Sequence, residues 1–155
     1  MPILWSRKLW RRRINRYGGR IMYEYKVEEI LRVVDGDTVD ILIDLGFGLT
    51  KKERVRVAGI DTPESRTRDL YEKKLGKEAA AYLTEQLAEG DIIICTEKDG
   101  KYGRMLGWLY KSGQTISIQE DMINRGYGWS YDGGTKEKTF EELKELRQKD
   151  GSWIE

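Results

Sequence analysis

The alternation of apolar and polar residues, together with short apolar runs, predicts five strands along the chain. From Val39 to Leu45, apolar side chains stand at every second position, which is the period of a strand with one buried face. Turn-forming Gly and Asp residues separate the runs that follow this pattern. The predicted strands are residues 23–34, 39–45, 54–60, 92–96 and 104–110.

A four-residue spacing of apolar side chains predicts the main helix. Leu75, Ala79, Leu83 and Leu87 would form one stripe along it, and Gly90 would end it. Connecting loops are expected at 46–52 and 65–74. The predicted helices are residues 76–88, 116–125 and 136–149. Three strands, a helix, two strands and two helices suggest a small antiparallel β-barrel with about three packed helices, an α+β fold.

The composition indicates a single globular domain and narrows the chemistry. The chain has 155 residues, 39% of them apolar and 35% charged, and no apolar run that could span a bilayer. Its one cysteine, Cys95, lies in an apolar run and is expected to be a buried thiol. It has no histidine, which excludes Ser-His and Cys-His hydrolysis and His-ligated zinc. Oxygen ligands remain, and they favour calcium or magnesium.

Charge is distributed unevenly along the chain. Residues 1–21 hold seven Lys or Arg and no acid, so removing their +7 from the net +1 leaves −6 for residues 22–155. This basic segment is either a disordered tail that binds phosphates or an upstream extension of a domain that begins near Met22. No signal peptide is visible, so an intracellular setting is favoured over secretion, in a bacterium or the host cytoplasm of a virus.

Acidic residues stand at the ends of two neighbouring predicted strands. Asp35 and Asp37 follow the first strand, and Asp61 and Glu64 follow the third. If the chain between them folds back as a hairpin, the two acidic ends become neighbours. Taken alone, each motif could simply be a turn capped by acids. Together they indicate a site for a divalent cation.

The residue types near these acids suit a phosphodiester substrate. Asp37 and Asp61 can supply carboxylates to calcium, and Thr62 can supply a backbone carbonyl. Arg56 and Arg104 can stabilise phosphate charge, because guanidinium groups form bidentate hydrogen bonds. Strand alternation alone cannot choose Arg56 over Arg54, and either could be solvated.

Glu64 could orient or deprotonate an attacking water. A carboxylate beside a cation and two arginines is expected to have a lowered pKa, which would make it a weak base. Positioning the water is therefore the role expected for Glu64.

Three sequence motifs together resemble the staphylococcal nuclease family. They are residues 34–39 (Val-Asp-Gly-Asp-Thr-Val), Arg56 five residues before 61–64 (Asp-Thr-Pro-Glu), and 101–104 (Lys-Tyr-Gly-Arg). The resemblance covers about residues 25–130 in order and spacing, and loosely the C-terminal helix. It implies a five-stranded OB-type barrel with three helices.

The resemblance also implies an activity: a calcium-dependent nuclease acting on DNA or RNA and often leaving 3′-phosphate ends. A monomer with no membrane association and a preference for single-stranded or flexible nucleic acid is expected. By position, the resemblance assigns calcium binding to Asp37, Asp61 and Thr62, catalysis to Arg56, Glu64 and Arg104, and places near the substrate or metal to Tyr102 and Asp35.

The chain departs from the family in its connections at 46–52 and 65–74 and in the acidic charge of residues 22–155. The aromatic segment 126–131 could stack on bases or pack in the core. Two other functions stay open. One is a non-catalytic interaction module of the same fold, and the other is a structural calcium-binding domain.

Overall fold

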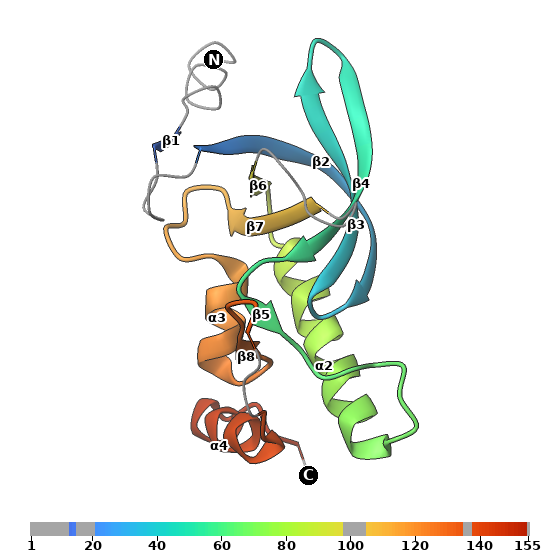
Figure 1. The fold of residues 1–155 in the computed structure, drawn as a ribbon, viewed down its shortest axis with the longest axis vertical. Helices are drawn as coiled ribbons and strands as arrows, with labels where there is room; N and C mark the ends of the chain where they lie inside the picture. The colour runs from blue at the N-terminus through green and yellow to red at the C-terminus, as the bar shows by residue number, and fades with distance from the viewer. Residues whose placement is uncertain (1–12, 15–20, 98–104, 135–137, 155) are drawn as a thin grey trace.

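Five strands close into a barrel in the computed structural model, which describes residues 13–14, 21–97, 105–134 and 138–154 (Figure 1). The strands run in the order β2, β3, β4, β7, β6, and β6 pairs back onto β2. Pairing is antiparallel except between β4 and β7. The barrel strands are β2 (Ile21–Asp35), β3 (Thr38–Gly46), β4 (Leu49–Val57), β6 (Ile92–Glu97) and β7 (Met105–Lys111). The expected five-stranded OB-type barrel is therefore confirmed.

Three further short strands lie outside the barrel ring. β1 (Arg13–Ile14) pairs with the start of β2. β5 (Ile60–Asp61) pairs with β8 (Trp129–Ser130) in a separate two-stranded sheet. This second sheet holds the chain that leaves β4 against the chain that leaves α3.

The apolar residues of the alternating pattern fill the barrel. Val39, Ile41 and Ile43 of β3 are at most 1% exposed, while the residues between them are partly exposed. Strands β4, β6 and β7 contribute in the same way. Inward side chains of these strands and of two helices form the core, which includes Val55, Leu83, Ile94, Leu109 and Met122.

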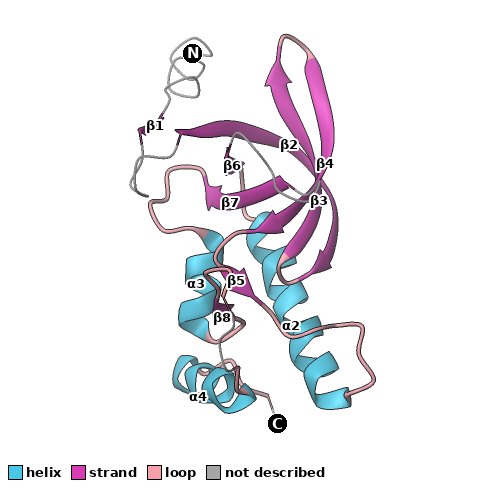
Figure 2. Cartoon of the chain, in the orientation of Figure 1, coloured by secondary structure: helices cyan, strands magenta, loops and turns pink. Residues whose placement is uncertain are grey.

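The described part of the chain has three helices, α2 (Leu70–Leu87), α3 (Ile118–Arg125) and α4 (Phe140–Asp150), of which α2 and α3 lie against the barrel and α4 lies beyond α3 (Figure 2). Helix α2 lies against β2 and α3, and α3 also lies against β7 and α4. The expected stripe of α2 is buried. Asp69 caps this helix, since its carboxylate accepts hydrogen bonds from the backbone of Tyr71 and Glu72 at 2.9 and 3.2 Å.

The expected boundaries of the third strand and of the loop before it were wrong. β4 begins at Leu49 rather than Arg54, because the turn after Gly46 is short and pairing resumes at once. Residues 49–52 have exposed side chains on both faces, so no apolar period marks them. The strand ends at Val57, and Ile60 belongs to β5. The remaining strands start or end within two residues of expectation.

The expected loop at 65–74 was also wrong, because α2 begins at Leu70. Leu70 and Tyr71 at its start are exposed, so the Asp69 cap, not a buried apolar stripe, marks the start. The other helices begin later than expected. α3 starts at Ile118, after a Ser117 cap, and α4 starts at Phe140. Within the described residues no helix is long and apolar enough to cross a bilayer.

Replacing Leu83 with Ala tests whether α2 closes the barrel. Leu83→Ala is expected to lower the free energy of unfolding by about 2–5 kcal/mol, because the side chain is fully buried and would leave a cavity. Leu70→Ala, at the 80% exposed first residue of the same helix, is the matched control and should change stability by less than about 0.5 kcal/mol. Urea denaturation measures both. Equal losses would contradict the role given to Leu83.

Candidate active site

The turn between β2 and β3 is pressed against helix α2. A Cβ atom on Gly36 would lie 2.8 Å from the Ala79 Cβ and 2.9 Å from the Thr62 methyl, so only glycine fits there without movement. The next residue, Asp37, is 8% exposed. Its carbonyl accepts a hydrogen bond from the Val57 amide at 2.8 Å. The Asp37 carboxylate is therefore held at a fixed place on the barrel rim.

The backbone packs closely against the second acidic segment, residues 60–64, at two glycines. On one side, a Cβ on Gly128 would lie 2.8 Å from the Asp61 carbonyl oxygen. On the other, a Cβ on Gly76 of α2 would lie 2.6 Å from the Glu64 carbonyl carbon and 2.7 Å from the Pro63 oxygen. Pro63 itself is fully buried. The segment thus fits between α2 and the chain after α3 with no room for a methyl group.

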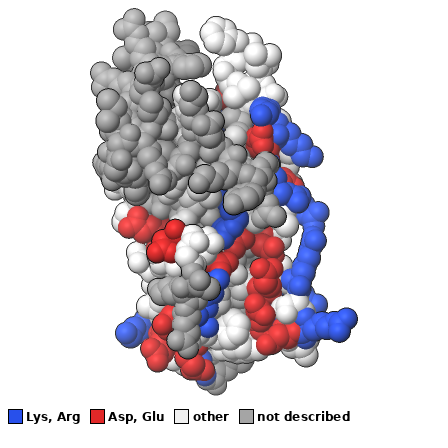
Figure 3. Space-filling view, in the orientation of Figure 1, with Lys and Arg blue, Asp and Glu red and all other residues white. Residues whose placement is uncertain are grey.

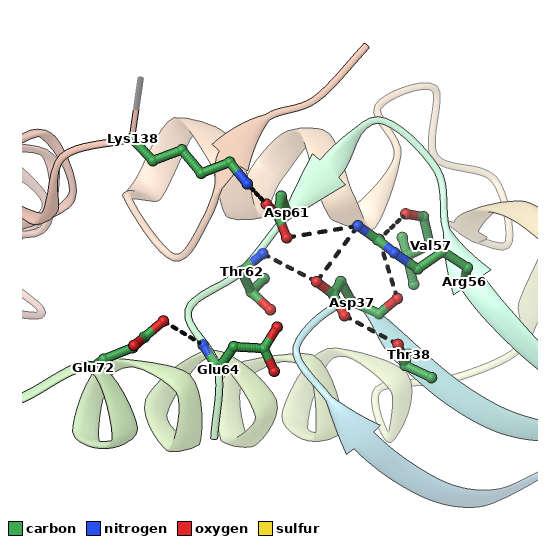
Figure 4. Close-up of polar contacts among 9 residues, drawn as sticks. All are labelled: Asp37, Thr38, Arg56, Val57, Asp61, Thr62, Glu64, Glu72 and Lys138. Carbon is green, nitrogen blue, oxygen red and sulfur yellow. Dashed lines mark hydrogen bonds and ion pairs between the residues drawn. The ribbon is translucent and has the colours of Figure 1, made fainter. Parts of the chain in front are cut away.

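The two acidic segments meet at the side chains of Asp37 and Arg56 (Figure 4). The Asp37 carboxylate accepts a hydrogen bond from the Thr62 amide at 3.1 Å. Arg56 Nη2 lies 3.6 Å from Asp37 and 3.7 Å from Asp61. The Arg56 guanidinium also donates to the Val57 carbonyl at 2.7 Å. One guanidinium therefore faces both carboxylates.

Arg54 has a different environment from Arg56. Its guanidinium donates two hydrogen bonds to the Asp40 carboxylate, at 2.8 and 3.0 Å, on an exposed part of the barrel. Arg56 is the arginine that the fold brings to the acidic residues, a choice that strand alternation left open.

Glu64 and Asp35 lie near Asp37 and Arg56. The Ser65 hydroxyl donates to Asp35, and the Glu64 amide donates to Glu72 at 3.3 Å. Partial burial raises the pKa of Glu64, and the charges of Asp35, Asp37 and Glu72 raise it further, while Arg56 opposes them. The lowered pKa was expected beside a bound cation and two arginines, and it stays a prediction, because among the described residues Arg56 alone opposes the three acids.

Lys138 is a site residue that the sequence did not indicate. Its ammonium contacts the Asp61 carboxylate from the side opposite Arg56 (Figure 4). It also lies over the rings of Trp129 and Tyr131, at 5.9 and 5.7 Å from their centroids. Nothing in its polar surroundings in the sequence marks it, because the contact depends on how the chain returns from β8 to α4.

The aromatic segment 126–131 divides between the two roles considered for it. Tyr127 is buried in the core and stacks on Tyr82 with ring centroids 4.3 Å apart. Trp129 is also buried, and its indole donates to the Thr139 carbonyl at 3.0 Å. Tyr131 is 38% exposed, and Arg56 lies 5.9 Å from its ring centroid. Tyr131 is thus the aromatic ring that borders the site.

The oxygen atoms near Asp37 fit calcium rather than a soft metal. The carboxylates of Asp37 and Asp61 face the same guanidinium, that of Arg56. Calcium accepts carboxylate oxygens and completes its shell with water. Among the described residues, no three acidic or sulfur side chains form a ready ligand cluster. The buried Thr62 hydroxyl has no hydrogen-bond partner there either.

On the face of the molecule that Figure 3 shows, a run of acidic side chains lies beside Lys and Arg side chains. Arg104 and Tyr102 lie outside the described residues, so their assignments stay predictions.

Sequence comparisons identify the family. A family model described as staphylococcal nuclease homologue matches residues 54–152, and the chain belongs to that family. The chain is 31% identical to a micrococcal nuclease of Shigella flexneri over 136 residues, covering 81% of this chain and 72% of that protein.

Two other relatives are longer than this chain. An uncharacterized protein of Bacillus anthracis is 35% identical over 103 residues, which cover 64% of this chain and 45% of that protein. The endonuclease YncB of Bacillus subtilis is 29% identical over 111 residues, which cover 68% and 49%. The chain thus spans about half the length of these two relatives.

Gly76→Ala tests how closely α2 holds the acidic segment. In an ordinary helix this change would stabilise the protein by up to about 1 kcal/mol. Here we expect a loss of about 1–3 kcal/mol, because the new methyl group would meet the Pro63–Glu64 backbone. Thermal unfolding measures the sign, and amide NMR shifts at Glu64 and Ser65 report displacement. The exposed neighbour Lys77→Ala is the control, and a stabilised Gly76→Ala variant would contradict the close contact.

Proposed function

We propose that this chain is a calcium-dependent nuclease that hydrolyses phosphodiester bonds of DNA, RNA or both and leaves 3′-phosphate ends. The observation that carries the proposal is the convergence of Asp37 and Asp61 on one guanidinium, that of Arg56. Membership of the nuclease family and relatives named as nucleases support it. We assign the nuclease domain to residues 22–155 and expect single-stranded or flexible substrates.

The proposed roles follow from where each oxygen and cation lies. Asp37, Asp61 and the Thr62 carbonyl would hold calcium. When bound, calcium would supply positive charge to the phosphate oxygens. Arg56 would hold two of these oxygens in a bidentate contact and would stabilise the charge that grows on them in the transition state.

Glu64 is the group proposed to handle water. The residue is exposed, so a water molecule can reach its carboxylate. Its carboxylate would accept a hydrogen bond from the attacking water and orient the oxygen toward phosphorus. Asp35, bonded to Ser65, would stay beside the metal without binding it directly. Arg104 is proposed as the second phosphate-binding arginine on its sequence motif, and Tyr102 as a residue near the nucleotide.

Removal of calcium or of a catalytic group should abolish cleavage. EDTA is expected to stop release of acid-soluble nucleotides, and Glu64→Gln or Arg104→Ala should each lower kcat by about 10²–10³-fold, because each removes a group that acts in the transition state. Assays with single- and double-stranded DNA and RNA, each with calcium, magnesium or EDTA, measure this. Glu85→Gln, on the exposed side of α2, is the matched control. Unchanged cleavage in EDTA would refute the mechanism.

Lys138→Gln should strengthen calcium binding. The Lys138 ammonium contacts the Asp61 carboxylate that calcium would use, so the ion must displace it. The Lys138 side chain is 35% exposed, so we expect a modest effect, a Kd lower by about two- to fivefold in titration calorimetry. Lys77→Gln is the control for lost charge. Weaker or unchanged calcium binding in Lys138→Gln would show that Lys138 does not compete for Asp61.

A further inference from the structure

The hairpin formed by β3 and β4 extends beyond the barrel (Figure 1). β4 pairs with β7 over Val55–Val57, whereas its pairing with β3 continues to Leu49. Leu49 and Arg56 are seven residues apart, which is about 23 Å of strand. We call residues 38–57 the arm. The arm therefore connects Arg56 of the proposed active site to a distant tip.

One face of the arm continues from Arg56 toward the tip. Because side chains alternate along a strand, Arg54 and Lys52 lie on the same face as Arg56. Their partners on β3 are Asp40 and Leu42. This face points away from the core, since the intervening Val55 is fully buried.

Cations outnumber acids around Asp40 in the middle of this face. A hydrogen bond from Arg54 lowers the pKa of Asp40. On β2, Arg32 is the register partner of Asp40, and the charges of Lys52 and Arg32 lower this pKa further. Asp40 offsets the charge of Arg54, and Asp44 lies further along the same face, so Arg32 and Lys52 supply the positive charge that a phosphate backbone could contact there.

The tip presents an aromatic ring to solvent. Phe47 is 93% exposed and has a φ of +56°, between Gly46 and Gly48, which also have positive φ. A bulky side chain is unfavourable in this left-handed conformation, where Gly or Asn is usual. The ring contributes no burial to the core, so its exposure has no explanation in the fold.

We infer that the outer face of the arm binds a single nucleic-acid strand leaving the active site, with Phe47 stacking on a base. The inference extends the proposed function, since the strand would start at Arg56. A basic track ending in an aromatic ring is the combination that binds single strands without sequence preference. In OB folds the face of the second and third barrel strands, here β3 and β4, binds oligonucleotides.

Phe47→Asn removes the ring and keeps a residue that tolerates the left-handed conformation. In EDTA, fluorescence anisotropy should show about tenfold weaker binding of a single strand of about 20 nucleotides, because one stacked base is lost. A strand of about 4 nucleotides, too short to reach the tip, should bind equally to both proteins. Phe47→Trp should restore the affinity. Leu70→Asn, at an exposed apolar residue away from the arm, is the matched control and should change neither affinity.

Lys52→Gln gives a second measurement on the same face. It should reduce the slope of log Kd against log salt for the long strand by about 0.7, the value for one lost phosphate contact on a single strand. Its affinity for the short strand should change less.

Equal affinity of Phe47→Asn and the unaltered protein for the long strand would overturn the inference. So would loss of binding to anionic phospholipid vesicles with unchanged oligonucleotide binding, which would make the tip a membrane contact. If Phe47 affects binding of the long strand but calcium produces no cleavage, the inference stands and the proposed nuclease activity fails.

Discussion

Asp37, through its side chain and its backbone carbonyl, connects the parts of the molecule that form the candidate site. Its carboxylate accepts the Thr62 amide, its carbonyl accepts the Val57 amide, and its charge faces Arg56. These bonds link the β2–β3 turn, the end of β4 and the segment after it. Since the carboxylate is almost fully buried, it needs these partners. The same contacts that compensate for its burial therefore also fix the geometry of the candidate ligands.

Close packing of the backbone at three glycines also positions the two acidic segments. Gly36, Gly76 and Gly128 each stand where a methyl group would collide with the acidic segments. Side chains on rigid elements are held more precisely than side chains on free loops. Here residues 60–64 have little regular structure of their own, but α2 and β8 hold them on both sides. Their rigidity comes from the lack of space around them.

The sequence predicted the barrel well because buried strands and the α2 stripe leave a clear apolar period. It failed at Leu49–Lys52, where side chains are exposed on both faces, and at the start of α2, where the Asp69 cap rather than an apolar stripe sets the boundary. The nearness of the two acidic ends followed from strand order. Lys138 could not be found this way, because its contact with Asp61 joins residues 77 positions apart in the sequence. The choice between Arg54 and Arg56 likewise required the actual pairing with Asp40.

The contact between Lys138 and Asp61 also bears on the order in which the protein is assembled. Arg56 and Lys138 balance the charges of Asp37 and Asp61 within the chain itself. In many small metalloproteins the ligands repel one another until the ion arrives, so folding waits for the metal. This chain carries its own counter-ions. The attraction of Arg56 and Lys138 for these carboxylates therefore does not depend on the arrival of an ion.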